Sequence, residues 1–418
     1  MAAATLAVVL YGRPIATVEQ TSHGQRRLEY LPDPGPTPLS LSMPLNQHAH
    51  THRTIDPYLL GLLPDREEVR ISMGQEFGIN GRNPFLLLTR IGLDCAGAVQ
   101  FCDPDIMDRV LAREGSLEPL TEAQIGAHIA ALSANSERSW VASNERWSLA
   151  GAQAKFALHR AASGDWAEAH GATPTTHIIK PGIADLADQA LNEHVCMDAA
   201  RRVGLRSARS EYTEFDGRPA IVVERYDRRR ASGSDDVVRI HQEDMCQALS
   251  VLPDRKYESD GGPSASRILS LLGVHSGTDA KYQFVQFLAY NYLIGGSDAH
   301  AKNFSLLMVG DQVRLAPLYD VASAFPYEDM SQELTMAVSG ERRFGRVSDQ
   351  HWASLAGKAG LEPGRVVEQV HDLARKVPDA MADAFSAAAQ AGADTEQLRD
   401  RMLPAMEEQA RSALRFTR

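Results

Sequence analysis

The residues best suited to chemistry lie between positions 298 and 320. Asp298 is followed five positions later by Asn303, and Asp320 closes the same stretch. In protein kinases an Asp orients the attacking hydroxyl, while an Asn at this spacing and a second Asp hold the metal ions that bridge the nucleotide phosphates. Any one of these residues alone is more often an ordinary loop residue. The three in this order favour phosphoryl transfer.

The flanking sequence predicts the elements that would position these side chains. Residues 287–294 form an apolar helical run that stops at two glycines, and residues 304–309 and 313–318 read as two strands joined by a short turn. The order is thus helix, loop, hairpin and second Asp. It places both acids at the ends of regular elements, where they would face one cleft. One departure is clear: Gly296-Ser297 stands where ordinary protein kinases have His-Arg, and His300 follows the Asp instead, as in lipid kinases.

A candidate phosphate loop lies upstream. Residues 148–158 predict a strand, a turn of small residues and a second strand. Small residues let backbone N–H groups approach phosphates closely. With a single glycine the motif is weak, and a plain hairpin turn is the alternative interpretation.

Two charged residues further along the chain fit the same site. Lys180 ends an apolar strand and is followed by proline, which suits a buried cation aimed at phosphates. The alternative is an exposed lysine that protects an edge strand. Glu193 lies in the next predicted helix, residues 191–203, where it would pair with Lys180 as the strand Lys and helix Glu of protein kinases do. An ordinary surface carboxylate is the alternative.

The apolar strand at 219–227 turns polar at Glu224, Arg225 and Tyr226, which is typical of a hinge whose backbone binds adenine. The arginines that follow, in residues 227–236, predict a solvated loop rather than a binding patch. His241 and Asp244 only partly meet metal-ligand spacing, so their segment is interpreted as the polar start of a helix.

Several strings along the chain resemble the HipA family of bacterial type II toxin–antitoxin kinases. They are SLAGAQAK, PTTHIIK, the Asn192-Glu193 helix, VVERYDR, HQEDMCQAL, KYESDGGP, SDAHAKNFS and LYDVASAFP. The strings PLSLSMPL, LLPD and Gly97-Ala98-Val99 are similar to the leading domain of that family. The resemblance therefore spans nearly the whole chain and is weakest after about residue 330.

The resemblance implies a serine/threonine protein kinase that binds ATP and Mg²⁺. Asp298 matches the catalytic Asp, Asn303 and Asp320 the metal ligands, and Ser148 the serine whose autophosphorylation switches family members off. Ala154 stands where the best-known pattern has Glu, which bears on the detail of the phosphate loop. The residues that the resemblance assigns to the ATP site are Ala150, Gly151, Ala152, Gln153, Lys155, Lys180, Glu224, Arg225, Tyr226, His300, Lys302 and Asn303.

The resemblance also implies partners. A HipB-like helix-turn-helix antitoxin would bind the kinase, partly through the leading domain, and operator DNA would be contacted only through that antitoxin. The substrate would be an aminoacyl-tRNA synthetase, such as glutamyl-tRNA synthetase, whose phosphorylation causes growth arrest and persistence. Nothing in the residues themselves names the target.

The composition agrees with an enzyme of this kind. The 418 residues carry a formal net charge of −11, whereas a protein that binds DNA by itself is normally basic. There is no run of 18 apolar residues, so no membrane span is expected. The four cysteines lack metal-ligand spacing, which predicts buried thiols in a cytoplasmic protein.

The predicted fold is α+β, a two-lobed kinase-like fold preceded by a small α/β N-terminal domain. Residues 1–143 form that leading domain, 144–226 a β-rich small lobe and 227–418 a mostly helical large lobe. The leading domain should begin with a three-strand meander over 4–31, and residues 103–143 should form a polar linker with two weak helices. Helices are predicted at 55–77, interrupted near Pro64, and at 84–91, 366–377, 379–391 and 395–414.

Two other functions remain open from the sequence. The first is a small-molecule or lipid kinase, which the position of His300 favours. The second is a non-catalytic, antitoxin-binding co-repressor, which the filled positions Asp298, Asn303 and Asp320 disfavour. Phosphate incorporation into protein separates the first from a protein kinase, and ATP turnover excludes the second.

Overall fold

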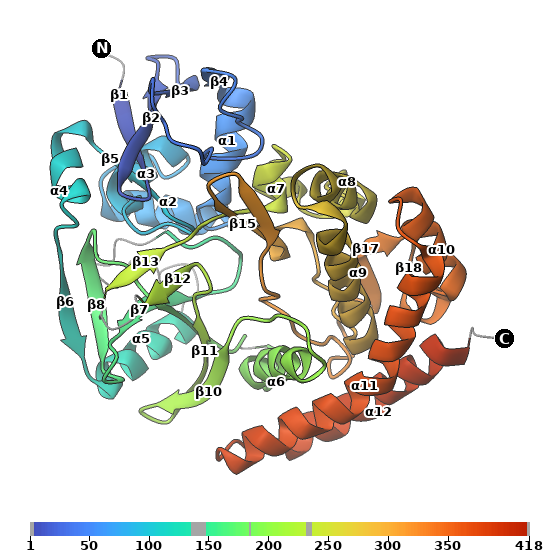
Figure 1. The fold of residues 1–418 in the computed structure, drawn as a ribbon. Coiled ribbons are helices and arrows are strands. Elements are labelled where there is room, and N and C mark those ends of the chain that lie inside the picture. Colours follow the sequence, from blue (N-terminus) through green and yellow to red (C-terminus); the bar gives the residue numbers. More distant parts are fainter. Residues whose placement is uncertain (1–3, 135–147, 184, 231–235, 416–418) are drawn as a thin grey trace.

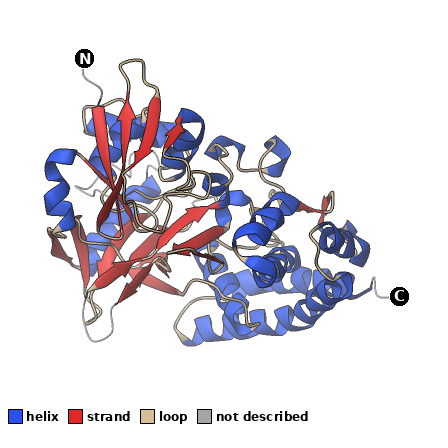
Figure 2. Ribbon diagram, turned by 45° about the horizontal axis from the view of Figure 1, so that its top comes forward, coloured by secondary structure: helices blue, strands red, loops and turns tan. Residues whose placement is uncertain are grey.

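The computed structural model describes residues 4–134, 148–183, 185–230 and 236–415. Most strands gather in one half of the molecule and most long helices in the other (Figures 1 and 2). The fold is therefore α+β, as predicted. No helix in the described ranges has both the length and the apolar character needed to cross a membrane.

The leading region is built on an antiparallel sheet of five strands in the order β4-β3-β2-β1-β5. The predicted meander is confirmed, because β1 pairs with β2 and β2 with β3. The predicted helix break near Pro64 is also present, between α1 and α2. The bounds are β1 Ala4–Leu10, β2 Arg13–Gln20, β3 Arg26–Tyr30, β4 Ala49–Thr51, α1 His52–Gly61, α2 Glu67–Glu76, α3 Pro84–Ile91 and β5 Val99–Cys102.

The region after β5 is more ordered than the predicted polar linker. It contains α4 (Met107–Leu111), β6 (Gly115–Leu120) and α5 (Glu122–Ala134). Strand β6 pairs with β8 (Trp166–Gly171) along its full length and forms the edge of the next sheet. It is exposed and contains Pro119, so it carries neither the alternation nor the apolar run that reveals a strand in sequence. Residues 135–143 of the predicted linker lie outside the described ranges.

The small lobe is a sheet of six strands in the order β10-β11-β9-β7-β8-β6. Helix α6 (Gln189–Arg202) packs against β10 and β11. The strand predicted to precede the small-residue turn is absent from residues 148–150, because Ser148 and Leu149 are buried against the leading region instead. The remaining bounds are β7 Phe156–Arg160, β9 His177–Pro181, β10 Ser210–Phe215 and β11 Arg218–Glu224.

The arginine run after the hinge forms part of a two-stranded ribbon, β12 (Arg228–Arg230) and β13 (Val237–Arg239). The predicted solvated loop is wrong at Arg228, which is buried and bound to two carboxylates. The local sequence does not reveal this burial, because one of the two carboxylates, Asp94, is more than a hundred residues away in the sequence. Residues 231–235 lie outside the described ranges.

The large lobe is mostly helical and surrounds α9, whose aromatic and aliphatic side chains are buried on nearly all sides. The two helices predicted at 366–377 and 379–391 form one continuous helix, α11, which passes through Pro378 (Figure 1). The bounds are β14 His241–Asp244, α7 Met245–Ala248, α8 Ala265–His275, α9 Gly277–Ile294, β15 Ser305–Val309, β16 Gln312–Leu315, β17 Glu333–Val338, β18 Glu341–Arg343, α10 Asp349–Lys358, α11 Pro363–Gln390 and α12 Glu396–Arg415.

The segment at 241–244 is a strand, not the start of a helix, and it pairs with β15 beside the predicted catalytic loop. Only its last residue has the predicted role, because the Asp244 carboxylate caps α7 by accepting from the backbone N–H groups of Cys246 and Gln247. All four cysteines are buried, as predicted.

Candidate active site

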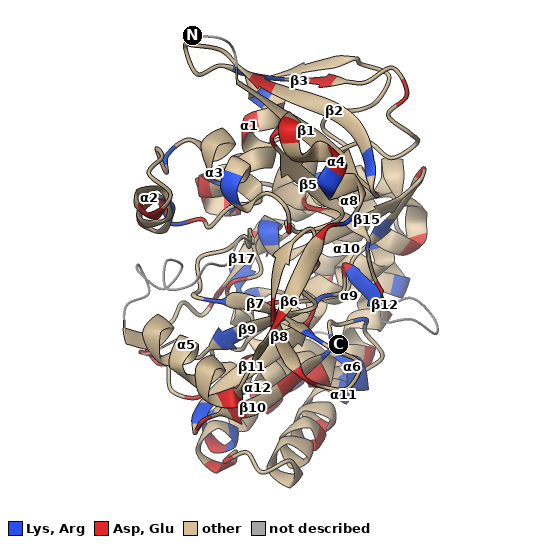
Figure 3. Ribbon diagram, turned by 90° about the vertical axis from the view of Figure 1, so that its left-hand side faces the viewer, with Lys and Arg blue, Asp and Glu red and all other residues tan. Residues whose placement is uncertain are grey.

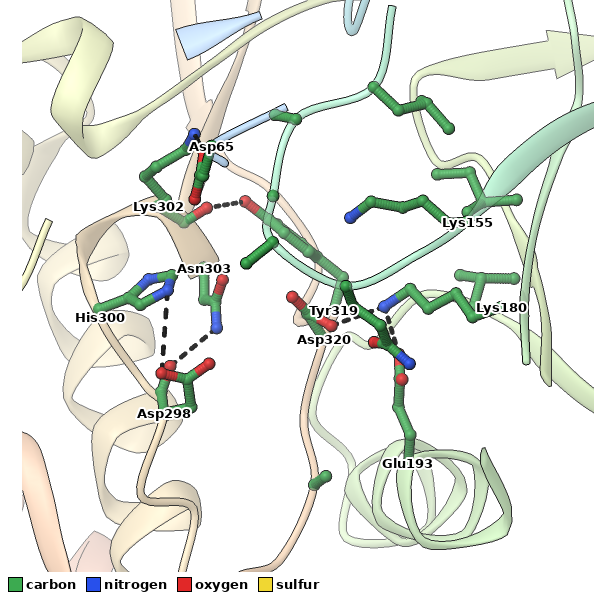
Figure 4. A pocket seen from close by; sticks show the side chains of 18 of the residues that line it. Asp65, Lys155, Lys180, Glu193, Asp298, His300, Lys302, Asn303, Tyr319 and Asp320 are labelled. Atoms are coloured by element: carbon green, nitrogen blue, oxygen red, sulfur yellow. Dashed lines mark hydrogen bonds and ion pairs between the residues drawn. The ribbon is translucent and has the colours of Figure 1, made fainter. Parts of the chain in front are cut away.

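A cavity of about 580 Å³ lies where the small-lobe sheet, the large lobe and the leading region meet. Figure 4 shows its charged side chains facing one another across this space. The structure brings almost all of the predicted site residues to its wall, and Ser148 alone among them does not line it. Those that do are Ala150, Gly151, Ala152, Gln153, Lys155, Lys180, Glu224, Arg225, Tyr226, Asp298, His300, Lys302, Asn303 and Asp320.

The loop that carries Asp298 is turned into the cavity by the end of α9. Gly295 has a left-handed φ of 69°, and a Cβ there would lie 2.6 Å from the Phe325 ring, so glycine is needed for both reasons. The Asn303 amide then donates a hydrogen bond of 2.8 Å to the Asp298 carbonyl and closes the loop on itself. This bond leaves Asn303 Oδ1 without a hydrogen bond to any described residue.

The Asp298 carboxylate is accessible from the cavity, with 63 % of its side chain exposed. It accepts a hydrogen bond of 3.1 Å from the Tyr257 hydroxyl. Desolvation by the surrounding protein, and then repulsion from the Asp320 carboxylate, raise the pKa of Asp298 to about 6. Asp298 is thus ionised at neutral pH and close to its protonation range.

His300 lies on the buried side of the same loop. Its Nε2 is 3.9 Å from Asp298 Oδ1, and its ring meets the Tyr257 ring edge-on. Burial, and then the Lys256 ammonium, lower the pKa of His300 to about 3. The ring is therefore neutral and supplies no charge to the cavity.

Asp320 and Lys180 form the centre of the charged wall. Lys180 Nζ donates to Asp320 Oδ1 at 2.6 Å and to Glu193 Oε1 at 2.8 Å, so the predicted pairing of the strand Lys with the helix Glu is confirmed. Burial alone would raise the pKa of Asp320, but Lys180 and Lys155 outweigh it and hold the pKa well below its ordinary value. Asp320 therefore remains a carboxylate throughout the physiological range.

Lys155 differs from Lys180 because no hydrogen bond or ion pair joins its ammonium to any described residue. Its side chain is almost fully buried and reaches toward the space beside Asp320 (Figure 4). Burial, and then the Lys180 ammonium, lower the pKa of Lys155 to about 8. A buried cation without a partner is costly, and an anionic ligand would satisfy it.

The phosphate-loop candidate is shaped around this lysine. Gly151 has a φ of 106°, and a Cβ there would lie 2.6 Å from Lys155 Nζ. The Gln153 side chain donates to the Pro181 carbonyl at 3.2 Å and to Gln189 Oε1 at 3.1 Å. The loop is therefore tied to the end of β9 and to α6, with its small residues facing the cavity.

These residues fit a magnesium–nucleotide complex. Lys155 and Lys180 supply the positive charge that a phosphate chain needs, and Asn303 and Asp320 supply the oxygen ligands that Mg²⁺ prefers. Within the described ranges no group of three or more His, Cys, Asp or Glu side chains could hold a metal alone. In nucleotide sites Mg²⁺ commonly takes one or two protein ligands and completes its shell with phosphates and water.

The hinge residues divide between backbone and side-chain roles. The Arg225 guanidinium points into a buried cluster with Asp94 and Asp227, so only the Arg225 backbone is available to a nucleotide. The Tyr226 ring packs on Tyr319, with ring centroids 5.4 Å apart, and its hydroxyl contacts Gln242. The side chain of Glu224 is exposed at the edge of the cavity.

Ser148 is fully buried, and its hydroxyl donates to the Leu62 carbonyl at 2.6 Å. Leu62 belongs to the leading region, which sequence reasoning did not place at the active site. The same is true of Asp65, which binds Lys302 and Lys256 in the cavity wall. The only sequence signal for these contacts was the LLPD string, and it gave no role for the Asp.

Comparisons with known proteins agree with the resemblance. A family model for the HipA-like C-terminal domain matches residues 147–381, and one for the HipA N-terminal domain matches residues 6–102. The chain belongs to the HipA family. It is 34% identical to the putative kinase Y4mE of Sinorhizobium fredii over 383 aligned residues, and this alignment covers 89% of each chain. It is 30% identical over 345 residues to the serine/threonine-protein kinase toxin HipA of Shewanella oneidensis, covering 80% of this chain and 78% of the toxin.

A solved HipA-family structure has the same fold. The complex of HipA, HipB and operator DNA from Shewanella oneidensis MR-1 matches with a TM-score of 0.84 at 26% identity, covering 98% of each chain. The two-lobed kinase-like fold with an N-terminal domain is therefore the fold of this HipA-family member. The domain boundaries at residues 143 and 226 stay predictions.

Proposed function

We propose that this chain is a serine/threonine protein kinase toxin that transfers the γ-phosphate of ATP to a protein hydroxyl. The observation that carries the proposal is the convergence on one cavity of Asp298, Asn303 and Asp320 with Lys155, whose ammonium has no partner among the residues that the structure describes. Its relatives' names as kinases, and one as a toxin, support the same activity.

Each charged residue then has a defined task. Asn303 and Asp320 would hold Mg²⁺, which would neutralise charge on the phosphates of bound ATP, the source of the transferred phosphoryl group. Lys155 and Lys180 would steady the phosphates. Asp298 accepts a hydrogen bond from the attacking Ser or Thr hydroxyl and takes its proton late. Tyr257 already donates to Asp298 at 3.1 Å, which is the interaction a substrate hydroxyl would make there. Catalysis on this scheme is positioning and electrostatics.

Ser148 is the proposed site of self-inactivation. A phosphate there would add roughly 1.5 to 2 negative charges at a position where the hydroxyl is enclosed and bound to the Leu62 carbonyl. The phosphorylated loop would have to leave this position, taking Gly151 and Lys155 with it. We expect Ser148→Asp to lose ATP binding and kinase activity, while Ser148→Ala keeps both. Full activity in Ser148→Asp would refute the switch.

The proposed partner is a HipB-like helix-turn-helix antitoxin, with operator DNA contacted through it. The Shewanella assembly supports this, because its kinase chain matches nearly the whole of this chain. The proposed target is an aminoacyl-tRNA synthetase such as glutamyl-tRNA synthetase, whose modification would stop translation and cause growth arrest and persistence. Copurification with a co-expressed antitoxin, and labelling of purified synthetases with ATP, test the two parts separately.

The first experiment is the intact mass of the chain before and after incubation with Mg²⁺ and ATP, beside Asp298→Asn. One phosphate on the wild type, mapped to Ser148 and absent from the variant, is the expected result. ATP turnover without phosphate on any protein would point to a small-molecule or lipid kinase. Absence of ATP turnover would point to a non-catalytic co-repressor.

A further inference from the structure

A short segment of the leading region, residues 62–65, lies between the phosphate loop and the catalytic loop. It follows α1, and two of its residues contact the phosphate loop through their backbone. Ser148 Oγ donates to the Leu62 carbonyl at 2.6 Å, and the Asp65 N–H donates to the Gly151 carbonyl at 3.1 Å. Pro64 and Gly151 also form a parallel bridge. The backbone of this segment therefore fixes both the start and the turn of the phosphate loop.

The side chain of Asp65 points to the other lobe. Its Oδ1 accepts from Lys302 Nζ at 2.5 Å and its Oδ2 from Lys256 Nζ at 2.8 Å. Lys302 belongs to the catalytic loop between His300 and Asn303. Burial alone would raise the pKa of Asp65, but Lys302 and Lys256 outweigh it and hold the pKa well below its ordinary value. The carboxylate is therefore charged and fully engaged.

One residue thus connects two loops that come from different lobes. Its main chain binds Gly151, and its side chain binds the lysine next to Asn303. We propose that Asp65 is a positioning residue for phosphoryl transfer, holding the phosphate loop at its distance from the catalytic loop. This inference rests on the proposed kinase function. It makes the leading region part of the active site rather than only a surface for a partner.

Loss of the Asp65 carboxylate has a defined consequence. Lys256 and Lys302 would lose their shared acceptor in the cavity wall, and residues 62–65 would lose their anchor on the large lobe. The phosphate loop would then leave its position more often, exposing Ser148. Because misplacement by about 1 Å can cost roughly a hundredfold in rate, both the KM for ATP and kcat should change.

The test compares Asp65→Asn with Asp56→Asn. Asp56 also belongs to the leading region and makes a partly buried ion pair, with Arg26, but it does not line the cavity. Three quantities are measured in each variant: the melting temperature, kcat and KM for ATP, and hydrogen exchange of the amides of residues 148–155. The expected result is at least about a tenfold loss of kcat/KM and faster exchange in residues 148–155 for Asp65→Asn only, measured at a temperature at which both variants are folded.

A merely structural role would move the two variants together. Equal exchange in residues 148–155, or equal kcat/KM, would overturn the inference even in an active kinase. Exchange is measured without nucleotide, so it remains decisive if the wild type transfers no phosphate. In that case the proposed function fails, while faster exchange in Asp65→Asn still supports the role of Asp65 in holding the loop. Asp65→Glu, which keeps the carboxylate, should recover part of the exchange protection.

Discussion

Two groups of buried charges in this molecule have opposite character. The first lines the active-site cavity. The second, the junction cluster, consists of Asp94, Arg225, Asp227, Arg228 and Arg239 and joins the leading region to the hinge. Arg228 of this cluster lies in β12, a strand of three arginines that is blue in Figure 3. Both groups bring side chains from distant parts of the sequence together, and each contains at least two acidic and two basic side chains.

Pairing is nearly complete in the junction cluster. The Asp94 carboxylate accepts from the guanidinium groups of Arg225, Arg228 and Arg239, and from the Thr175 hydroxyl at 2.6 Å. The three guanidinium groups also donate to backbone carbonyls, among them that of Cys95. Burial alone would raise the pKa of Asp94, but the three arginines outweigh it and hold the pKa well below its ordinary value.

Pairing is incomplete in the cavity. Lys155 has no partner among the described residues, and Asp298 faces open space with its pKa raised rather than lowered. Buried charge alone therefore does not mark an active site. A closed set of paired charges holds a structure together, whereas a set that lacks a partner is prepared for a ligand.

The largest effect is expected from Asp298→Asn. The amide keeps the shape of the side chain but cannot take a proton, so phosphotransfer should fall by roughly 10²–10⁴-fold with little change in melting temperature. Phosphate incorporation from labelled ATP measures the loss. Asp311→Asn, at the exposed turn between β15 and β16, is the control and should keep wild-type activity. Near-full activity in Asp298→Asn would remove Asp298 from the mechanism.

In the junction cluster, a substitution is expected to lower the stability of the fold. Asp94→Asn leaves three buried guanidinium groups with one carboxylate, Asp227, and should lower the free energy of unfolding by about 3–5 kcal/mol. Urea denaturation measures this loss. Asp372→Asn breaks a surface pair with Lys376, in which both side chains are about half exposed, and should change stability by less than about 1 kcal/mol. If the two variants were equally stable, the junction cluster would not have the structural role assigned to it.

A smaller effect, on the pH dependence of ATP binding, is expected from Lys155. Its pKa is lowered to about 8 by burial and then by Lys180, so the free protein loses this charge as the pH rises through 8. Binding of ATP phosphates favours the charged form. The Kd for ATP should therefore rise above pH 8, by at most about tenfold for each pH unit. Titrations with ATP between about pH 7 and 9.5 measure this slope.

Lys155→Arg is the matched variant for this effect, because a guanidinium stays charged over the whole range. It should remove the pH dependence even if its affinity is lower at neutral pH. Lys180 should not contribute, because Asp320 and Glu193 keep its pKa above the ordinary value despite burial. An unchanged slope in Lys155→Arg would assign the titration to another group.

The sequence was most informative where chemistry and local structure coincide. The spacing of Asp298, Asn303 and Asp320 lies within one helix–loop–hairpin unit, so neighbouring residues determine its geometry. The end of α9 at Gly295 follows from the same local rules. The pairing of Lys180 with Glu193 was predictable because one strand and one adjacent helix carry both residues.

Contacts between distant segments were not predictable in this way. The partners of Asp65 are 191 and 237 residues away, and nothing local to the LLPD string indicates them. Arg228 was interpreted as solvated for the same reason. Strand β6 was missed because its polar, proline-containing sequence forms a strand only through its neighbour β8. Tertiary context, rather than local preference, decides each of these cases.

Glu243 is a buried acid of a third kind, which belongs to neither group. Glu243 is fully buried in β14 and has no cationic partner within the described ranges. It accepts from Ser40 Oγ at 2.5 Å and from the Leu41 N–H at 2.8 Å, both in the leading region. Burial raises its pKa from 4.5 to about 8, so at neutral pH the group is mostly protonated. Unlike Asp94, it remains buried by giving up its charge.

The consequence for stability has a definite sign. The folded chain binds more protons at Glu243 than the unfolded chain between pH 4.5 and 8. The stability from this group is therefore fully present below pH 4.5 and lost as the pH rises through 8. Glu243→Gln does not titrate, and its amide can accept from Leu41 and donate to Ser40.

At about pH 5 the variant and the wild type should thus differ by less than about 1 kcal/mol in free energy of unfolding. The variant should gain on the wild type as the pH rises, by at most about 1.4 kcal/mol for each pH unit. Urea denaturation at several pH values measures this trend. A difference that stays constant with pH would mean that Glu243 is ionised in the folded chain, and its burial without a cation would then lack an explanation.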